Sequence, residues 1–471
     1  MSHLRLPILQ DTPPDEPPPS MGEGSLGRDG HHKRPYPADV KGRFVKRRRV
    51  VFAVLIALWT ALPWIKVGGH PAVFLDIEMR QFFLFGLTFN AQDVWLLFFL
   101  LSGVGFGLVY ATAVLGRVWC GWACPQTVFL EGVFRPIERL IMGPRNVALR
   151  RKASGGFDRA WRAVVMHGAY LIAAALVAHI FIAYFVSLPR LFAMMRTAPG
   201  AHPEAFAWMI AVTAIMYGNF AFFREQLCVV ICPYGRLQSV LLDDDSLVVG
   251  YDEKRGEPRG KAKSAKGACV DCNRCVVVCP TGIDIRDGLQ LDCIACTACI
   301  DACDEVMDKL ERPRGLIRYD SLRGLRGEKR QLLRPRLYAY TALLIIGAVV
   351  ATFAFRGREP FEANMVRLPG TPYTREGGTI RNGFELHLVN KQSEATTFDI
   401  EPVEAPDLAF TISMTAVELE PLASRRVPIF VTMDQARFVA DRPFTLRVRG
   451  HGASGKTVEH EARAVFLGAR P

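Results

Sequence analysis

Histidine is absent from the part of the chain that is richest in cysteine, and this absence excludes several kinds of metal site. Eight of the twelve cysteines lie between residues 269 and 303, with no histidine among them. Mixed cysteine–histidine zinc sites and Rieske-type centres both need histidine ligands, so this stretch forms neither. The chain also lacks a C-x-x-C-H sequence, which excludes the standard attachment of a c-type haem.

The eight cysteines form two near-copies of one spacing, in which three cysteines at every third position are followed by a fourth. The copies are Cys269, Cys272, Cys275 and Cys279, followed by Pro280, and Cys293, Cys296, Cys299 and Cys303, followed by Asp304. Zinc sites use paired C-x-x-C knuckles, and disulfides belong to oxidising compartments, so both explain the spacing less well. The spacing therefore predicts two [4Fe–4S] clusters in one ferredoxin-like fold.

The fourth cysteine of each copy is expected to reach the other cluster, as it does in two-cluster ferredoxins. On that pattern, one cluster is held by Cys269, Cys272, Cys275 and Cys303, and the other by Cys293, Cys296, Cys299 and Cys279. Two clusters bound in this crossed way lie close enough to exchange electrons.

Long apolar runs indicate a membrane protein. Five runs approach the roughly 20 residues that cross a bilayer, and they cover residues 50–67, 94–115, 163–187, 205–223 and 337–355. A further apolar stretch, residues 74–89, is interrupted by Asp76, Glu78 and Arg80. We expect it to be an interfacial or re-entrant segment, with a sixth span as the alternative.

The positions of lysine and arginine predict the orientation of these spans. Basic residues gather before the first run, between the second and third, and between the fourth and fifth. Since positive loops stay in the cytoplasm, the cysteine-rich segment is expected inside and the C-terminus outside. Charges that flank spans set topology and attract anionic lipid, so we expect no nucleic-acid partner.

The two ends of the chain have compositions of their own. Residues 1–40 are rich in Pro, Asp, Glu and Gly without apolar periodicity, which predicts disorder, and no secretory signal is recognisable. After Arg356 there is no cysteine, and short alternating stretches predict strands at residues 384–389, 397–400, 408–412, 427–431 and 444–448. Such a pattern over about 110 residues predicts a seven-strand immunoglobulin-like β-sandwich, with protein contact as its default role.

The remaining four cysteines form two C-x3-C-P motifs, and each motif follows an apolar run. They are Cys120 with Cys124, and Cys228 with Cys232. A spacing of four predicts that both sulfurs of a pair lie on one helical face, and the proline is expected to bend or break the helix after them. Two such bends could enclose one volume with four thiols, which suit Cu(I), zinc, iron–sulfur centres or disulfide exchange. The alternative is that these cysteines only pack as small apolar residues.

Two histidines, His167 and His179, lie in the third apolar run, and no other run contains one. A b-type haem held by histidines of two helices therefore lacks its second ligand. We interpret both as polar contacts between helices, with a role in metal relay as the alternative.

The order of these features resembles the CcoG family, also called FixG or RdxA. The resemblance extends from about Arg43 to the β-domain and includes the segment GLIRYDS at residues 315–321. Family members are accessory proteins in the assembly of cbb3-type cytochrome c oxidase and are thought to reduce Cu(II) to Cu(I). The resemblance implies that Cys120, Cys124, Cys228 and Cys232 are the catalytic, copper-binding thiols, with the eight downstream cysteines as cluster ligands.

The membrane and cluster half is also similar to NapH and NosR-type quinol-linked electron conduits, which share C-x3-C-P motifs. The β-sandwich favours the oxidase-assembly family, because the simpler quinol conduits generally lack it. We therefore expect a membrane-bound oxidoreductase that reduces Cu(II). A quinol-oxidising relay to another acceptor and a non-catalytic, copper-binding assembly scaffold are the alternatives.

The sequence as a whole predicts a multidomain, multi-pass protein of the bacterial inner membrane. Its predicted parts are a disordered cytoplasmic segment (1–40), a four-span domain with both C-x3-C-P motifs (41–245), a cytoplasmic α+β ferredoxin domain (246–335), a fifth transmembrane helix (336–356) and a periplasmic immunoglobulin-like domain (357–471). Expected partners are membrane lipid, copper, cbb3 oxidase assembly proteins or a copper chaperone or transporter, and a cytosolic electron donor or quinol. A homodimer is also allowed.

Overall fold

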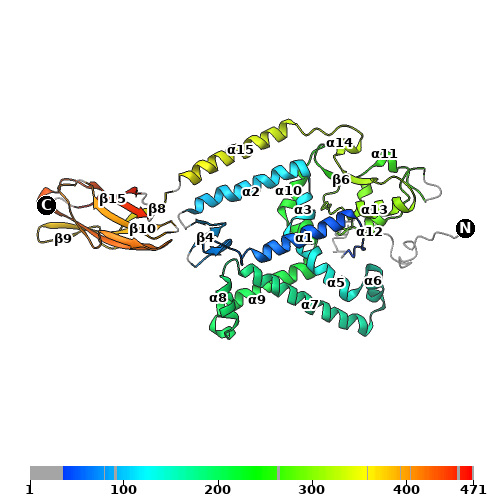
Figure 1. Cartoon of the computed structure of the whole chain (residues 1–471), viewed down its shortest axis with the longest axis horizontal. Coiled ribbons are helices and arrows are strands. Elements are labelled where there is room, and N and C mark those ends of the chain that lie inside the picture. Colours follow the sequence, from blue (N-terminus) through cyan, green and yellow to red (C-terminus); the bar gives the residue numbers. More distant parts are fainter. Residues whose placement is uncertain are drawn as a thin grey trace. The chain divides into compact units, whose positions relative to one another are not determined.

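The computed structural model describes residues 35–78, 80–89, 93–261, 266–357, 359–392, 394–403, 405–452 and 457–468. The chain divides into two compact units (Figure 1). The first contains the residues up to Leu87 together with Val94–Val350, and the second contains Thr88–Asp93 together with Ala351–Pro471. Most of the predicted disordered segment, residues 1–34, lies outside the described residues.

Four helices are long and apolar enough to cross a membrane. They are α2 (Val94–Leu115), α7 (Gly156–Ile182), α9 (Pro203–Gly218) continued by the π-helical turn η4 (Asn219–Phe223), and α15 (Pro335–Arg356). At most a third of each span is buried inside the protein, and none of α15 is. Such surfaces suit contact with lipid chains, and the four helices confirm four of the predicted apolar runs as helical.

The first predicted span is wrong in its bounds. Helix α1 covers Arg43–Ala61, begins with a strongly basic turn and ends before Leu62. Its apolar part, from Val50 onward, extends for about 18 Å at the rise of an α-helix, whereas a bilayer core is about 30 Å thick. In the described part of the chain, four helices rather than five therefore meet the requirements of a span.

The interrupted apolar stretch after α1 is a small antiparallel sheet, which excludes the sixth span. Strands β3 (Val73–Asp76), β4 (Gln81–Leu84) and β5 (Leu87–Phe89) follow in sequence order, after a two-stranded ribbon of β1 (Lys66–Val67) and β2 (His70–Pro71). Gly86, with a φ of 86°, makes the turn into β5. Polar residues at the turns let the chain reverse where a helix would have needed continuous apolar sequence.

Short helices connect the long ones. Between α2 and α7 lie α3 (Val118–Trp122), α4 (Pro125–Phe129), the π-helical turn η2 (Leu130–Phe134), α5 (Arg135–Met142) and α6 (Arg145–Ser154). Helix α8 (Leu188–Met195) and the 3-10 turn η3 (Pro199–Ala201) connect α7 to α9, and the π-helical turn η5 (Leu227–Ile231) precedes α10 (Pro233–Leu241).

The cysteine-rich segment forms a compact domain on a two-stranded antiparallel sheet. Strand β6 (Val248–Tyr251) pairs with β7 (Ile317–Asp320), which lies within the GLIRYDS segment. Helices α11 (Glu253–Gly256), α12 (Arg274–Val277), α13 (Ala298–Lys309) and α14 (Leu322–Leu325) and the 3-10 turn η6 (Ile285–Asp287) complete it. Residues 35–40 are ordered against this domain, since Val40 is buried there and the Ala38 N–H donates to Val277 O.

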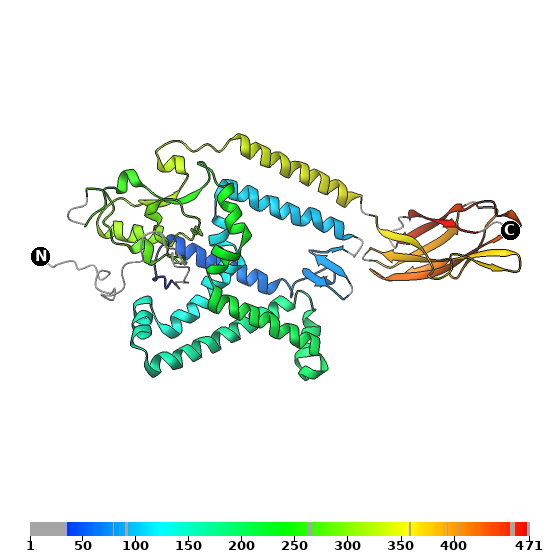
Figure 2. The ribbon, with the colours of Figure 1, turned by 180° about the vertical axis from the view of Figure 1, so that it is seen from behind.

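The second unit is an immunoglobulin-like β-sandwich, as predicted, but its described residues form nine strands rather than seven. The sandwich is the C-terminal part of the ribbon, coloured yellow-orange to red in Figure 2. One sheet has the order β12-β14-β10-β8 with β9 on β10, and the other has the order β13-β11-β15-β16. The strands are β8 (Phe361–Arg367), β9 (Thr374–Glu376), β10 (Thr379–Asn390), β11 (Thr396–Pro402), β12 (Ala409–Ile412), β13 (Ala416–Leu419), β14 (Ser424–Asp434), β15 (Arg442–Gly452) and β16 (Thr457–Phe466), with η7 (Gln435–Arg437) as a 3-10 turn. All five predicted strands overlap observed ones, because alternating apolar residues face the common core.

Candidate metal centres

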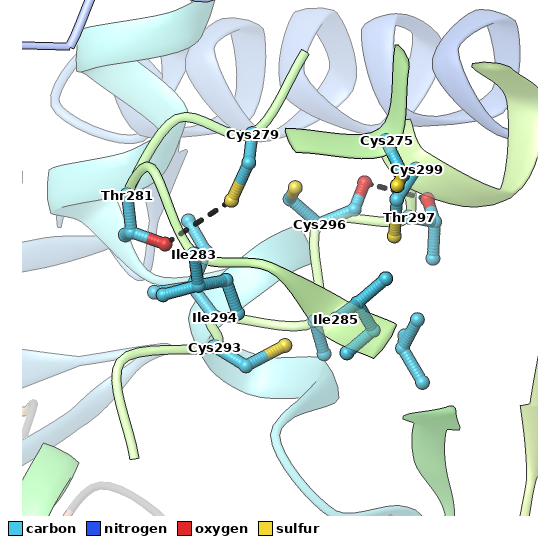
Figure 3. A pocket seen from close by; sticks show the side chains of 12 residues that line it. Cys275, Cys279, Thr281, Ile283, Ile285, Cys293, Ile294, Cys296, Thr297 and Cys299 are labelled. Atoms are coloured by element: carbon cyan, nitrogen blue, oxygen red, sulfur yellow. Dashed lines mark hydrogen bonds between the residues drawn. The ribbon is translucent and has the colours of Figure 1, made fainter. Parts of the chain in front are cut away.

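The eight clustered cysteines surround two neighbouring cavities. The first is lined by Cys275, Cys279, Cys293, Cys296 and Cys299 (Figure 3). The second is lined by Cys269, Cys272, Cys275 and Cys303. The fourth cysteine of each copy thus lies with the first three of the other copy, and Cys275 lines both cavities.

The two cysteine loops have the same backbone shape. In each, the residues on both sides of the middle cysteine have positive φ: Asp271 and Asn273 around Cys272, and Ala295 and Thr297 around Cys296. This left-handed conformation curls each loop so that successive cysteines turn toward one centre.

The side chains and backbone around the cavities fit an iron–sulfur cluster in each. Apart from cysteine, the first cavity is lined mainly by apolar side chains such as Ile283, Ile285 and Ile294. Backbone N–H groups of Ala295 and Ala298 point at the sulfurs of Cys293 and Cys296. Thiolates in an apolar cavity need hydrogen-bond donors of this kind, and such bonds also tune the potential of a cluster.

Burial controls the charge state of these cysteines. It raises the pKa of Cys293 to about 11 and that of Cys303 to about 12. Near the second cavity, the Arg286 guanidinium opposes this rise in the pKa of Cys272 and Cys275. Arg286 is held by Asp284 and Asp271, so a positive charge stays fixed beside this group of sulfurs.

The C-x3-C-P motifs do not have the predicted geometry, because each helix ends between its two cysteines. Cys120 lies in α3, whereas Cys124 is extended, with a ψ of 127°, and caps the start of α4. Cys232 likewise precedes α10, while Cys228 lies in η5. The expectation that each pair shares one helical face was therefore wrong. The prolines Pro125 and Pro233 begin new helices, since proline at the first helical position loses no hydrogen bond.

The two motifs nevertheless bring their thiols within electrostatic reach of one another. Burial raises the pKa of Cys120 to about 11 and that of Cys228 to about 12, and neighbouring thiols from the other motif add to both rises. Across the described ranges, no group of three or more cysteine, histidine or carboxylate side chains is arranged to hold a single metal ion, whether at these motifs or in the two cavities.

The first motif lies directly against the second cysteine loop. Gly121 has no side chain, and a Cβ there would lie 2.6 Å from the carbonyl oxygens of both Ile294 and Ala295. Cys120 packs beside the apolar cluster that contains Ile294 and Cys296. Glycine at position 121 therefore lets the backbone of the motif approach that of the loop.

Hydrogen bonds fix this contact from three sides. Arg48 Nε donates to Gly121 O at 3.0 Å, and Arg117 donates to Cys293 O at 3.1 Å and to Leu291 O. Trp122 Nε1 donates to Tyr319 Oη at 3.1 Å, and Tyr319 Oη donates to Ala295 O at 3.0 Å. No sequence pattern had predicted a role for these residues. The W-C-G-W sequence and the tyrosine of GLIRYDS are the signals that could have indicated them.

Buried ion pairs join the two halves that contain the motifs. Arg135 pairs with Glu131 at 3.1 Å and with Glu225, and Arg224 pairs with Glu138 at 2.5 Å. Arg135 and Glu138 therefore find their counter-charges at Glu225 and Arg224, which lie 90 and 86 positions further along the chain.

The two histidines of α7 make separate local contacts. His167 Nδ1 lies 2.9 Å from Tyr217 Oη of α9, and His179 Nδ1 lies 2.7 Å from Ala175 O, one turn earlier in the same helix. These contacts agree with the interpretation of polar packing within and between helices.

Comparison with known proteins agrees with this architecture. Residues 223–322 match the family model of a 4Fe-4S dicluster domain, residues 96–145 that of a 4Fe-4S binding domain, and residues 351–469 that of the IG-like fold at the C-terminus of FixG. Protein RdxA of Cereibacter sphaeroides is 34% identical over 459 residues, which is 92% of this chain and 97% of RdxA. The nitrogen fixation protein FixG of Rhizobium meliloti is also 34% identical, over 466 residues covering 87% and 88% of the two chains.

The chain belongs to the FixG/RdxA family. It is an iron–sulfur electron-transfer protein with apolar helices typical of a membrane protein. Protein RdxB of Cereibacter sphaeroides is 35% identical, over 86% of this chain and 88% of RdxB. Among solved structures, a FixG-related protein from Vibrio parahaemolyticus is similar to 23% of this chain and 97% of its own, with a TM-score of 0.19 and 17% identity.

Proposed function

We propose that this FixG/RdxA-family protein reduces Cu(II) to Cu(I) for the assembly of a cbb3-type cytochrome c oxidase. The four thiols Cys120, Cys124, Cys228 and Cys232 are the proposed copper site. The observation that supports this most is the close contact of Gly121 with Ile294 and Ala295, because it joins a thiol motif to a cluster-binding loop. The reaction is a one-electron reduction of the copper ion. The only bonds that it requires are those between the thiol sulfurs and the copper.

The chain's own residues contribute to this reaction by binding and by spacing. When bound, [4Fe–4S] clusters supply one-electron storage. Cys269, Cys272, Cys275 and Cys303 would hold one, and Cys279, Cys293, Cys296 and Cys299 the other. Soft thiolates stabilise Cu(I) more than Cu(II). The four cysteines of the C-x3-C-P motifs, here called the membrane-edge cysteines, would therefore favour the reduced ion.

The proposed orientation places the cluster-binding domain in the cytoplasm of a bacterium and the β-sandwich in the periplasm. The basic start of α1 lies against the cluster-binding domain, where the N–H groups of Phe44 and Val45 donate to Asp301 at 3.2 and 2.8 Å. This supports a common side of the membrane for both, and positive segments stay in the cytoplasm. Since α2, α7 and α9 make three crossings, this orientation requires the segment that leads from α1 to α2 to cross the membrane as well.

The test compares purified wild-type protein with a variant in which the four membrane-edge cysteines are changed to alanine. Both are reduced anaerobically with dithionite, freed of excess reductant and mixed with Cu(II). Cu(I) is then measured with a chromogenic chelator, and cluster oxidation by visible absorbance. We expect the variant to keep its clusters and lose copper reduction.

A packing control uses Thr112→Val with Tyr234→Phe. It removes the 2.6 Å hydrogen bond between α2 and α10 beside the thiols but leaves all four cysteines in place. Wild-type copper reduction by the four-alanine protein, with intact clusters, would exclude the proposed site.

A quinol-oxidising relay is the second candidate function. It is favoured by the His167–Tyr217 pair, since Phe222 stacks on His167 and is 57% exposed on the apolar surface of the membrane helices. This candidate predicts that quinol reduces the clusters in the absence of copper, and that His167→Phe abolishes this reduction.

A further inference from the structure

One polar side chain beside the proposed copper-binding thiols has an amide whose oxygen is hydrogen-bonded and whose nitrogen is not. Gln238 of α10 is fully buried, and its Oε1 lies 3.3 Å from the Sγ of Cys120, which donates to it. Its Nε2 is also buried and has no hydrogen-bond partner among the described residues. A buried amide N–H without a partner is costly, so its retention here points to a partner that is present in another state.

Arg117 adds a second unsatisfied donor at the same place. Its terminal nitrogens bond to Cys293 O at 3.1 Å and Gly235 O at 3.4 Å, while its Nε is buried and has no partner in the described part of the chain. Arg117 is 7% exposed, so its charge is poorly solvated. Two buried donors near Cys120 thus have no acceptor within the described ranges, although Asp292 is an acidic group within electrostatic reach of Arg117. The unpaired donors suit an anionic group at this position.

A metal-bound thiolate is such a group. A thiol donates one hydrogen bond, whereas a thiolate only accepts. The Oε1 of Gln238 satisfies the thiol but would repel the thiolate, and Nε2 would satisfy the thiolate. A glutamine amide can exchange the two atoms by rotating about its last side-chain bond, whose torsion has broad, roughly two-fold preferences.

We propose that Gln238 is a positioning residue that accepts a hydrogen bond from the free Cys120 thiol and donates one to the Cys120 thiolate when copper is bound. The inference rests on the proposed function, because it needs copper at the membrane-edge thiols. As the sulfur–copper bond forms, the sulfur–hydrogen bond breaks and the proton leaves to solvent. The oxidation state of Cu(I) does not change in this step.

The arrangement makes the two motifs interdependent. Gln238 belongs to the helix that Cys232 caps, yet its amide contacts a thiol of the other motif. Cys120 is therefore the thiol whose copper-bound form the second motif stabilises.

The test is Cu(I) binding by cluster-containing Gln238→Leu protein, measured by competition with a chromogenic Cu(I) chelator. Leucine removes the amide with little change in volume. Since a hydrogen bond to a charged group contributes roughly a factor of ten or more in an equilibrium constant, we expect about tenfold weaker binding. The near-ultraviolet charge-transfer band of the copper thiolate should move to lower energy, because a thiolate without that bond is easier to oxidise. A purely structural role would leave the band unchanged.

Tyr234→Phe is the matched control on the same helix, since its hydroxyl contacts Thr112 rather than a cysteine. We expect wild-type affinity and an unshifted band. In a Cys120→Ser background, Gln238→Leu should cause no further loss, because residues that act through one contact are not additive.

Unchanged affinity and an unchanged band in Gln238→Leu would overturn the inference, provided that the wild-type protein binds Cu(I). Failure of the wild-type protein to bind Cu(I) would instead overturn the proposed function. If Gln238→Leu loses its clusters, Gln238→Met decides the question, because methionine fills a similar volume without a charge and has no N–H group to donate to the thiolate. Weaker binding by that variant supports the inference, and wild-type binding refutes it.

Discussion

Enlarging Gly121 is the most direct test of the contact between the first thiol motif and the second cysteine loop. A Cβ at this position would lie 2.6 Å from two carbonyl oxygens of the loop, at Ile294 and Ala295. The loop must retreat by roughly 0.8 Å to restore an ordinary contact of 3.4 Å, and the clashing atoms are backbone atoms that cannot rotate away. Overpacking of this kind costs about 1–3 kcal/mol of stability.

The same displacement should slow electron transfer, because the rate of electron tunnelling falls as the distance between donor and acceptor grows. We therefore expect Gly121→Ala to slow the oxidation of the reduced protein by Cu(II), and Gly121→Val to slow it further. The assay is anaerobic stopped-flow absorbance of the clusters after mixing with Cu(II), with cluster content and thermal unfolding in detergent measured in parallel.

Gly103→Ala in α2 is the control, because a Cβ there meets no atom within 4 Å. It should leave the oxidation rate unchanged. If Gly121→Val keeps its clusters and is oxidised at the wild-type rate, the contact does not set the distance for electron transfer, and the reasoning is refuted.

Three further predictions concern the ion pairs, the thiols and the cluster ligands. Arg135→Leu removes the ion-pair partner of Glu225 and Glu131 and should cost about 3–5 kcal/mol in thermal unfolding, whereas Arg190→Leu, which removes an exposed pair, should cost less than about 1 kcal/mol. Because burial raises the pKa of Cys120 to about 11 and of Cys228 to about 12, both are protonated at neutral pH and must lose a proton to bind Cu(I). Chelator competition between pH 6 and 8 should therefore show affinity rising about tenfold per pH unit for each thiol that binds, and a pH-independent affinity would contradict thiol ligation. Cys303→Ser should remove the cluster of the second cavity and keep the other, so that quantitative EPR reports one cluster, and loss of neither or of both would contradict the crossed ligand sets.

Periodicity explains why most of the architecture could be predicted. Apolar runs near the length of a bilayer gave four of the long helices, and alternating apolar residues gave five strands of the sandwich. The first span was predicted wrongly because hydropathy joined the short apolar part of α1 to the loop and ribbon that follow it. The length of an apolar run does not by itself indicate the residue at which a helix ends.

The cysteine spacing predicted the cofactor of the cluster-binding domain for a similar reason, because it too is a local pattern. A ligand set of three cysteines at every third residue is a local property, since a short curled loop can direct all three sulfurs to one centre. The fourth ligand of each set is distant in sequence, and its expected place came from the ferredoxin pattern. In the fold, α13 starts at Ala298 and brings Cys303 to the second cavity.

The environment of the membrane-edge thiols depends on tertiary contacts that the spacing of residues along the sequence does not predict. The sequence by itself determined two C-x3-C-P motifs after apolar helices, together with an iron–sulfur domain and a β-sandwich, because spacing and periodicity are local. Only the tertiary structure decided that the helix ends between the cysteines of each pair, that Gly121 touches the loop of Ala295, and that Gln238 faces Cys120. These features join residues more than a hundred positions apart or depend on packing around them, and the free energy of such contacts depends on which surfaces meet rather than on the order of residues along the chain.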